Sequence, residues 1–109
     1  MAIMKCVCKH FTRGTTPSFT FDMSVHLDSV EELNVTFTQL NTVVLEKNKN
    51  DIIVLDADSV KVTLTEQETK LFSDKHDVKC QFRIKYTNGA IVTSEPPIIF
   101  EVNPMLRED

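Results

Sequence analysis

The sequence predicts an all-β fold, an immunoglobulin-like antiparallel β-sandwich of roughly seven or eight strands with one short helix at about residues 66–72. Three observations lead to this prediction. Apolar residues recur at every second position in several short segments, which is the spacing of half-buried strands. Turn-forming residues separate these segments, and a single helical pattern interrupts them. A small closed barrel is the alternative, because the chain has no Trp and so lacks the Cys…Trp…Cys signature of immunoglobulin domains.

The first strands are predicted within residues 13–38. Gly14 permits a tight backbone turn, and Pro17 fixes φ at the start of the strand that follows. Apolar and polar side chains alternate over residues 19–23 and again over residues 33–38. Each of these two segments should therefore place one face on a core.

The middle of the chain contains two continuous apolar runs, residues 43–45 and 52–55, on either side of the polar stretch 46–51. This arrangement predicts a hairpin whose strands are covered on both faces or pair with a neighbour. Residues 60–64 alternate again and predict another half-buried strand.

Residues 66–72 predict the helix. Thr65 and Glu68 have the spacing of a capping box, and acidic residues occupy the first turn. Leu71 and Phe72 are expected to plug the end of the sheets, before a polar turn at residues 73–77.

The longest alternation covers residues 78–87. Its apolar face consists of Val78, Cys80, Phe82, Ile84 and Tyr86. Asn88-Gly89 follows directly, and then Ala90–Thr93, so a hairpin with a type I′ turn is expected. Pro96-Pro97 sets the start of the last strand, at residues 98–102.

Length and charge limit the number of domains and the classes of partner. The 109 residues are enough for one domain, 1–109, with short extensions at about 1–8 and 104–109. A formal net charge of -4 without a basic stripe argues against nucleic acid. No apolar run is long enough for a signal peptide or a membrane span, so we expect a cytoplasmic site of synthesis and no membrane partner.

Candidate catalytic residues do not form a recognisable set. His10, His26 and His76 each lack a second group at useful spacing, and solvated or structural roles are favoured for all three. With only two glycines the chain cannot build a glycine-rich phosphate loop. We therefore expect no enzymatic activity, no cofactor and no small-molecule substrate.

Metal binding is not indicated either. Asp56-Ala57-Asp58 offers too few oxygen ligands for calcium, and a turn between two strands accounts for it better. Cys6, Cys8 and Cys80 do not have the spacing of structural zinc sites. An odd number of cysteines in a reducing compartment favours buried thiols over a disulfide.

Contacts with other proteins are the interaction that the sequence favours. The run Ile52–Leu55 suits a sheet edge that pairs with a neighbour, and apolar residues at the chain ends suit docking on another subunit. The candidate interface residues are Ile3, Met4, Arg13, Ile52, Ile53, Val54, Leu55, Met105 and Leu106. Arg13 is expected to bond either to its own domain, with Glu95 or Glu101 as partner, or to a neighbouring subunit.

Three segments together resemble a known family. They are "FTRGTTPSFTF" at 11–21, "VKVTLTEQETKLF" at 60–72 and "VKCQFRIKYTNGAIVTSEPPIIFEV" at 78–102. In this order they are similar to small bacteriophage and prophage virion structural proteins of Gram-positive hosts, and to the N-terminal domain of phage baseplate upper proteins. The residues that match the Arg-Gly-(Thr/Asp)-Thr strand start and the helix start of these proteins are Arg13, Gly14, Thr15, Thr16, Leu64, Thr65, Glu68 and Thr69.

The resemblance implies a non-enzymatic virion structural protein with an immunoglobulin-like fold, present in several copies and bound to other virion proteins. It would act as a decoration or adaptor module, assembled in the bacterial host cytoplasm. Baseplate upper proteins usually continue into further domains, whereas this sequence stops at Asp109, so head, neck or collar, tail and baseplate stay open. The alternative is a receptor- or carbohydrate-binding module. Such modules normally expose aromatic side chains, whereas the single Tyr, Tyr86, falls on an apolar face.

Overall fold

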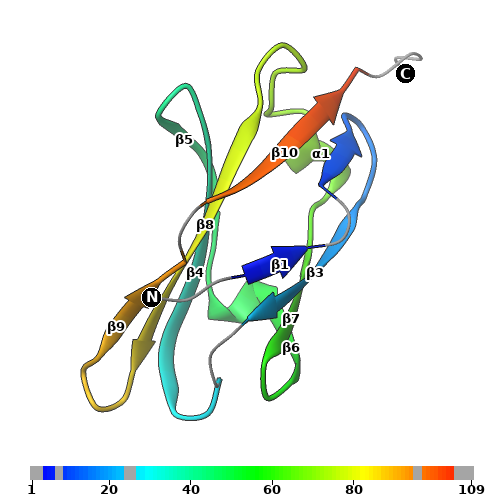
Figure 1. Cartoon of the computed structure of the whole chain (residues 1–109). Coiled ribbons are helices and arrows are strands. Elements are labelled where there is room, and N and C mark those ends of the chain that lie inside the picture. Colours follow the sequence, from blue (N-terminus) through cyan, green and yellow to red (C-terminus); the bar gives the residue numbers. More distant parts are fainter. Residues whose placement is uncertain (1–3, 7–8, 24–26, 95–96, 105–109) are drawn as a thin grey trace.

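The computed structural model describes residues 4–6, 9–23, 27–94 and 97–104, and it shows a two-layer β-sandwich (Figure 1). This arrangement confirms the predicted all-β sandwich. The elements in chain order are β1 (Met4–Cys6), β2 (His10–Thr12), β3 (Ser18–Met23), β4 (Val30–Gln39), β5 (Thr42–Lys47), the 3-10 turn η1 (Lys49–Asp51), β6 (Ile52–Asp56), β7 (Ser59–Thr63), α1 (Glu66–Thr69), β8 (Val78–Tyr86), β9 (Ile91–Thr93) and β10 (Ile98–Asn103). One sheet has the strand order β1-β3-β7-β6. The other has the order β2-β10-β8-β4-β5, with β9 also paired to β8.

The core lies between the two sheets, because the alternating segments point their apolar faces at one another. β3 alternates exposed and buried positions along its whole length, as predicted, and β8 does so over most of its length. All seven phenylalanines of the chain are buried in this core. Phe21 packs edge-on against Phe82 of the opposite sheet, at a distance of 4.9 Å between ring centroids. Burying each such side chain stabilises the fold by about 2 kcal/mol.

The described residues contain ten strands, more than the sequence predicted. The additional strands β1 and β2 have three residues each, which is too short to show a period. β2 also lies parallel to β10, with Phe11 in register with Val102, so the second sheet is mixed rather than purely antiparallel. Such long-range pairing leaves no local pattern in the sequence.

The hairpin predicted between residues 43–45 and 52–55 is wrong. β5 pairs with β4, whereas β6 pairs with β7 in the other sheet. The polar connection between them crosses from one sheet to the other through η1, and the side chain of Asn48 caps this turn by accepting a hydrogen bond from the backbone of Asn50 (2.9 Å). The polar stretch between these two apolar runs therefore connects the two sheets and does not form the tight turn of a hairpin.

The hairpin β8–β9 is confirmed, but the expected type I′ turn is wrong. Of the turn residues Asn88 and Gly89, only Gly89 has a positive φ, of 90°. Tyr86 accepts from the Gly89 N–H and donates to the Ala90 carbonyl, both at 2.9 Å, which closes a three-residue loop with a glycine bulge. Both central residues have positive φ instead in the β4–β5 turn, at Leu40 (51°) and Asn41 (64°).

The helix begins where the capping box predicted but is shorter than expected. Thr65 accepts from the backbone of Glu68 (3.1 Å), and the Glu68 carboxylate accepts from the backbone of Thr65 (2.8 Å). α1 ends at Thr69 rather than at residue 72. Phe72 plugs the core as predicted, whereas Leu71 is exposed, because beyond the helix end successive side chains point to different sides.

Two polar side chains hold the end of the sandwich that contains α1 (Figure 1). The amide of Gln39 donates to the carbonyls of Ser73 (2.8 Å) and His76 (2.9 Å) and accepts from the Ser73 N–H (2.9 Å). Lys47, which is buried, pairs with Glu68 at 2.9 Å. These contacts attach the loop 73–77 and α1 to the strands β4 and β5.

Candidate functional site

The most distinct surface feature is the edge of the four-stranded sheet at β6. Among the described strands, β6 pairs with β7 alone and is the last strand in its sheet order. Ile53, Val54 and Leu55 are 56%, 49% and 50% exposed, respectively. Three consecutive half-exposed apolar side chains on the last strand of a sheet make this edge the candidate site for contact with another chain. We refer to these three residues as the β6 edge.

The backbone register explains which of the predicted edge residues are exposed. Ile52 and Val54 lie opposite Val62 and Val60, which are both buried, so this row faces the core. Ile52 is 6% exposed and belongs to the core, whereas Val54 is 49% exposed. The core therefore ends between these two positions, and three of the four residues in the predicted run are accessible.

The turn that follows β6 carries negative charge. Asp56 accepts a hydrogen bond from the backbone of Asp58 (3.1 Å), so it forms the turn that the sequence predicted for Asp56-Ala57-Asp58. This hydrogen bond lowers the pKa of Asp56. A second hydrogen bond, between the side chains of Asp56 and Asp58, raises the pKa of Asp58. The negative charges of Asp56 and Asp22 raise the pKa of Asp58 further. Three carboxylates therefore gather at this end of the sheet.

The other edge of the same sheet is β1, which pairs with β3 and contains the candidate residue Met4. Met4 is in register with Met23. The other candidates from the chain ends, Ile3, Met105 and Leu106, lie outside the described residues.

Arg13 bonds to its own domain. Its guanidinium donates to the carbonyl of Lys70 at the end of α1 (3.3 Å), and its backbone N–H donates to the Asn103 carbonyl (3.1 Å). The expected partner Glu101 is therefore not the one observed, and Glu95 lies outside the described residues. The Nε atom of Arg13 is buried and has no hydrogen-bond partner in the described part of the chain.

Thr69, at the end of α1, also contacts the turn that contains Arg13 and Gly14. Its buried hydroxyl accepts from the Gly14 N–H (2.9 Å) and lies within donating distance of the carbonyls of Thr15 (3.2 Å) and Glu66 (2.9 Å). The Arg-Gly-Thr-Thr turn and the helix start, which are the two short motifs quoted above, thus bind each other. Sequence reasoning had noticed both motifs but could not show that they are neighbours.

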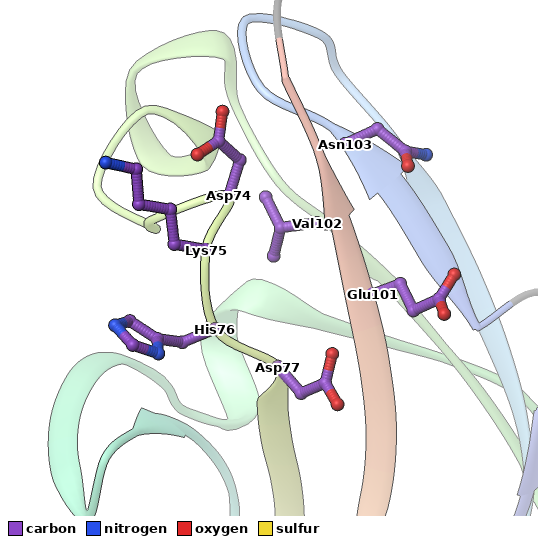
Figure 2. A pocket seen from close by; sticks show the side chains of 7 residues that line it. All are labelled: Asp74, Lys75, His76, Asp77, Glu101, Val102 and Asn103. Carbon is purple, nitrogen blue, oxygen red and sulfur yellow. The ribbon is translucent and has the colours of Figure 1, made fainter.

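A polar hollow of about 240 Å³ lies between the loop before β8 and the end of β10. Its lining residues are Asp74, Lys75, His76, Asp77, Glu101, Val102 and Asn103. Their side chains do not converge, because Lys75 and His76 point away from β10 while Glu101 and Asn103 extend from its other side (Figure 2). This arrangement does not place an acid, a base and a nucleophile around one point.

Within the described part of the chain, the histidines and acidic groups do not assemble into a chemical centre elsewhere. His10 lies on β2 and His76 in the loop 73–77, both exposed, and His26 falls outside the described residues. Across the described ranges, no three His, Cys, Asp or Glu side chains come together in a way that could hold a metal ion. Cys80 is a buried thiol, as expected. Among the helices that the structure describes, none is long and apolar enough to cross a membrane.

Among the residues that the structure describes, five other large apolar side chains are exposed, and the sequence pattern did not single them out as interface candidates. They are Leu40, Val43, Leu71, Ile91 and Ile99. Each of them lies on a different element or connection, whereas the β6 edge contributes three in a row. A surface with singly scattered apolar residues is normal, so the β6 edge is the stronger candidate.

Comparisons with known proteins bear on the fold. No family model matches the chain, and no curated protein matches it. Fifty-nine chains of solved structures match, among them one from the structure described as "Structural basis of T cell specificity and activation by the bacterial superantigen toxic shock syndrome toxin-1". The two chains share 6% sequence identity with a TM-score of 0.51, over 96% of this chain and 100% of that chain. Because proteins with unrelated functions share such sandwiches, the likeness establishes the fold alone.

Proposed function

We propose that this protein is a non-enzymatic structural component of a bacteriophage virion, a decoration or adaptor module that binds neighbouring virion subunits. The observation that carries the proposal is the β6 edge, where three apolar side chains are about half exposed on an unpaired strand. The resemblance of three sequence segments to phage virion proteins supplies the biological setting. Head, neck or collar, tail and baseplate are all compatible with it.

The size of the exposed surface suits assembly rather than a tight isolated complex. Burying the exposed half of Ile53, Val54 and Leu55 contributes about 1 kcal/mol each, or about 3 kcal/mol together. A millimolar complex already requires about 4 kcal/mol. A single edge contact is therefore weak, but repetition by the symmetry of a particle multiplies weak contacts.

The residues that carry the resemblance have a role inside the domain. Arg13 and Gly14 contact Lys70 and Thr69, so both short motifs hold the fold together. The surface that binds other subunits is then free to differ between relatives. The motif residues therefore stabilise the domain, while the exposed edges contact the partner. This separation of roles supports an adaptor or decoration module.

The alternative, a receptor- or carbohydrate-binding module, receives less support. Sugar binding normally uses exposed aromatic rings for stacking. All seven phenylalanines are in the core, Tyr86 is half-buried, and the chain has no Trp. A glycan array with reproducible hits would favour this alternative.

The test is the presence of the protein in purified particles. Particles induced from the strain that carries the gene would be separated from free protein on a density gradient and digested for mass spectrometry. We expect peptides of this chain at a fixed ratio to the major structural proteins across the particle fractions, and antibody labelling of intact particles at one location. If the protein stays with the soluble lysate and never follows the particles, the proposal is wrong.

A further inference from the structure

The two edges of the four-stranded sheet run in opposite directions. Every neighbouring pair in the order β1-β3-β7-β6 is antiparallel. Because the number of strands is even, the first and the last strand point opposite ways. A second copy in the same orientation, placed beside β6, therefore presents its β1 in the antiparallel direction. Adding a strand to an open edge in this way is a common mode of recognition.

The backbone register shows which positions would meet. The two rows that cross the sheet from edge to edge are Lys5, Asp22, Ser59, Asp56 and Cys6, Phe21, Val60, Val54. β6 has a β-bulge between Val54 and Asp56, which leaves Leu55 without a partner in these rows. Continuing the rows across this bulge into the next copy places its Lys5 opposite Asp56 and its Cys6 opposite Val54. Apolar Cys6 thus meets apolar Val54, and basic Lys5 meets acidic Asp56. Pairs of these kinds stabilise antiparallel strands.

The acidic charge at the β6 end of the contact extends beyond Asp56. Residues 50–60 contain Asp51, Asp56 and Asp58 and no lysine or arginine, whereas the one charged residue of β1 is Lys5. Asp22 adds a further carboxylate beside the turn that follows β6, where its charge acts on Asp58. The β6 edge therefore ends in an acidic group, and the charged residue of β1 is basic.

Pairing of β6 with a second β6 is less favourable. Residues opposite each other in antiparallel strands face the same side, so a twofold axis has to pass through a residue that meets its own copy, such as Val54. Asp51 of one copy then lies at the same end as Asp56 and Asp58 of the other. Like charges gather at both ends of such a contact, which destabilises it.

We propose that copies of this chain assemble head to tail, with β1 of one copy added to the β6 edge of the next, so that the four-stranded sheet continues between copies. The inference rests on the proposed function and names the partner of the β6 edge as a second copy of the chain. Such a contact closes into a ring or extends as a filament, depending on the rotation between copies. Met4 on β1 and the run Ile52–Leu55 on β6 were each predicted from the sequence as interface candidates. In the proposed contact they belong to the two sides that meet.

The test uses Val54→Cys in the full chain, oxidised at high protein concentration and separated on a non-reducing gel. Opposed positions in antiparallel strands have Cα atoms about 4.5–5.5 Å apart, which a disulfide can span. Each copy then has a thiol at position 54 in addition to Cys6, Cys8 and the buried Cys80, and the proposed register puts Cys6 opposite position 54. We expect loss of the monomer band to a ladder of dimers, trimers and longer chains. Mass spectrometry of the digested ladder should identify a disulfide between positions 54 and 6.

Two matched variants check the register. Val54→Cys combined with Cys6→Ser should lose the ladder, and Ile99→Cys, an exposed position of the other sheet, should give none. The same ladder in either control, or no ladder from Val54→Cys, would overturn the inference. A dimer that is joined through two residues 54 and does not extend would show twofold pairing and would also overturn it. Circular dichroism melting checks that each variant is folded.

A second measurement avoids added thiols. In sedimentation velocity, the wild type should shift toward larger species as its concentration rises. Asp56→Lys, at an exposed position, places a positive charge opposite Lys5 of the next copy and should return the protein to monomers. Equal association of the wild type and this variant would contradict the proposed pairing.

Failure of this inference and failure of the proposed function can be told apart. The cross-linking uses purified protein, whereas the virion role is tested in particles. Particles that contain the protein, with no ladder from Val54→Cys, would leave the virion role standing and refute head-to-tail assembly through the β6 edge. A ladder from a protein that never follows the particles would support head-to-tail assembly and refute the virion role.

Discussion

Thr69→Val should destabilise the protein, because the hydroxyl of Thr69 joins the two sequence motifs. Thr69 is fully buried, and valine keeps its shape. The substitution removes the acceptor of the Gly14 N–H and the donor that the carbonyls of Thr15 and Glu66 share. A buried donor left without a partner costs about 1–3 kcal/mol. We expect a loss of about 2 kcal/mol, which lowers the Tm of a domain of this size by about 8 °C.

The assay is urea unfolding followed by far-ultraviolet circular dichroism, which suits a chain without Trp. The midpoint should fall while the slope with urea stays constant, as for a change in stability alone. Thr20→Val is the matched control, because Thr20 is exposed on β3, and surface substitutions of this kind change stability by less than about 0.5 kcal/mol.

A loss no larger than that of Thr20→Val would refute the reasoning. It would mean that the turn and the helix start do not depend on each other through this hydroxyl. The motifs that carry the resemblance would then need another explanation than stability of the domain.

Three further predictions concern α1 and the six-stranded sheet that contains β4 and β5. Burial opposes ionisation of Glu68, but hydrogen bonds from Lys47 and Thr65 outweigh it and lower the pKa of Glu68. The pairing therefore stabilises the fold above the ordinary pKa of the carboxyl group and is lost as the pH falls through the lowered value. In urea titrations Glu68→Gln should be less stable than wild type at pH 7 and should approach it in acid; an equal deficit at both would argue against the pair. Gln39→Leu removes three hydrogen bonds to the loop 73–77 and should cost about 1–3 kcal/mol. Hydrogen exchange should accelerate in that loop first, and unchanged exchange would contradict its attachment through Gln39. Leu40 has a φ of 51° and is 70% exposed, so Leu40→Asn should raise stability by up to about 1 kcal/mol, whereas a loss would show that Leu40 makes a contact worth more than its strain.

The candidate site was predicted in part. The sequence pointed to the apolar run at residues 52–55, and three of its four residues are exposed. Ile52 is the exception, because its burial depends on how far the core reaches along β6. Arg13 bonds to its own domain, which was one of the two alternatives that the sequence left open. Its partner, the carbonyl of Lys70, carries no charge and so could not be found by matching opposite charges along the chain.

Local periodicity determined which face of each strand is buried. The alternation in β3, β8 and β10 translated directly into buried and exposed positions, because side chains of a strand point to alternate sides whatever the strand pairs with. The capping box likewise fixed the start of α1, since it needs only residues four positions apart or fewer.

Tertiary structure alone decided which strands are neighbours. The parallel pairing of β2 with β10, the assignment of β5 and β6 to different sheets, and the contact of Thr69 with Gly14 all join segments far apart in the chain. These choices follow from how the whole apolar surface is buried at once, so no short window of sequence contains them. The same non-local packing left β6 and β1 as opposite edges of one sheet, the two edges that we propose to join in head-to-tail assembly.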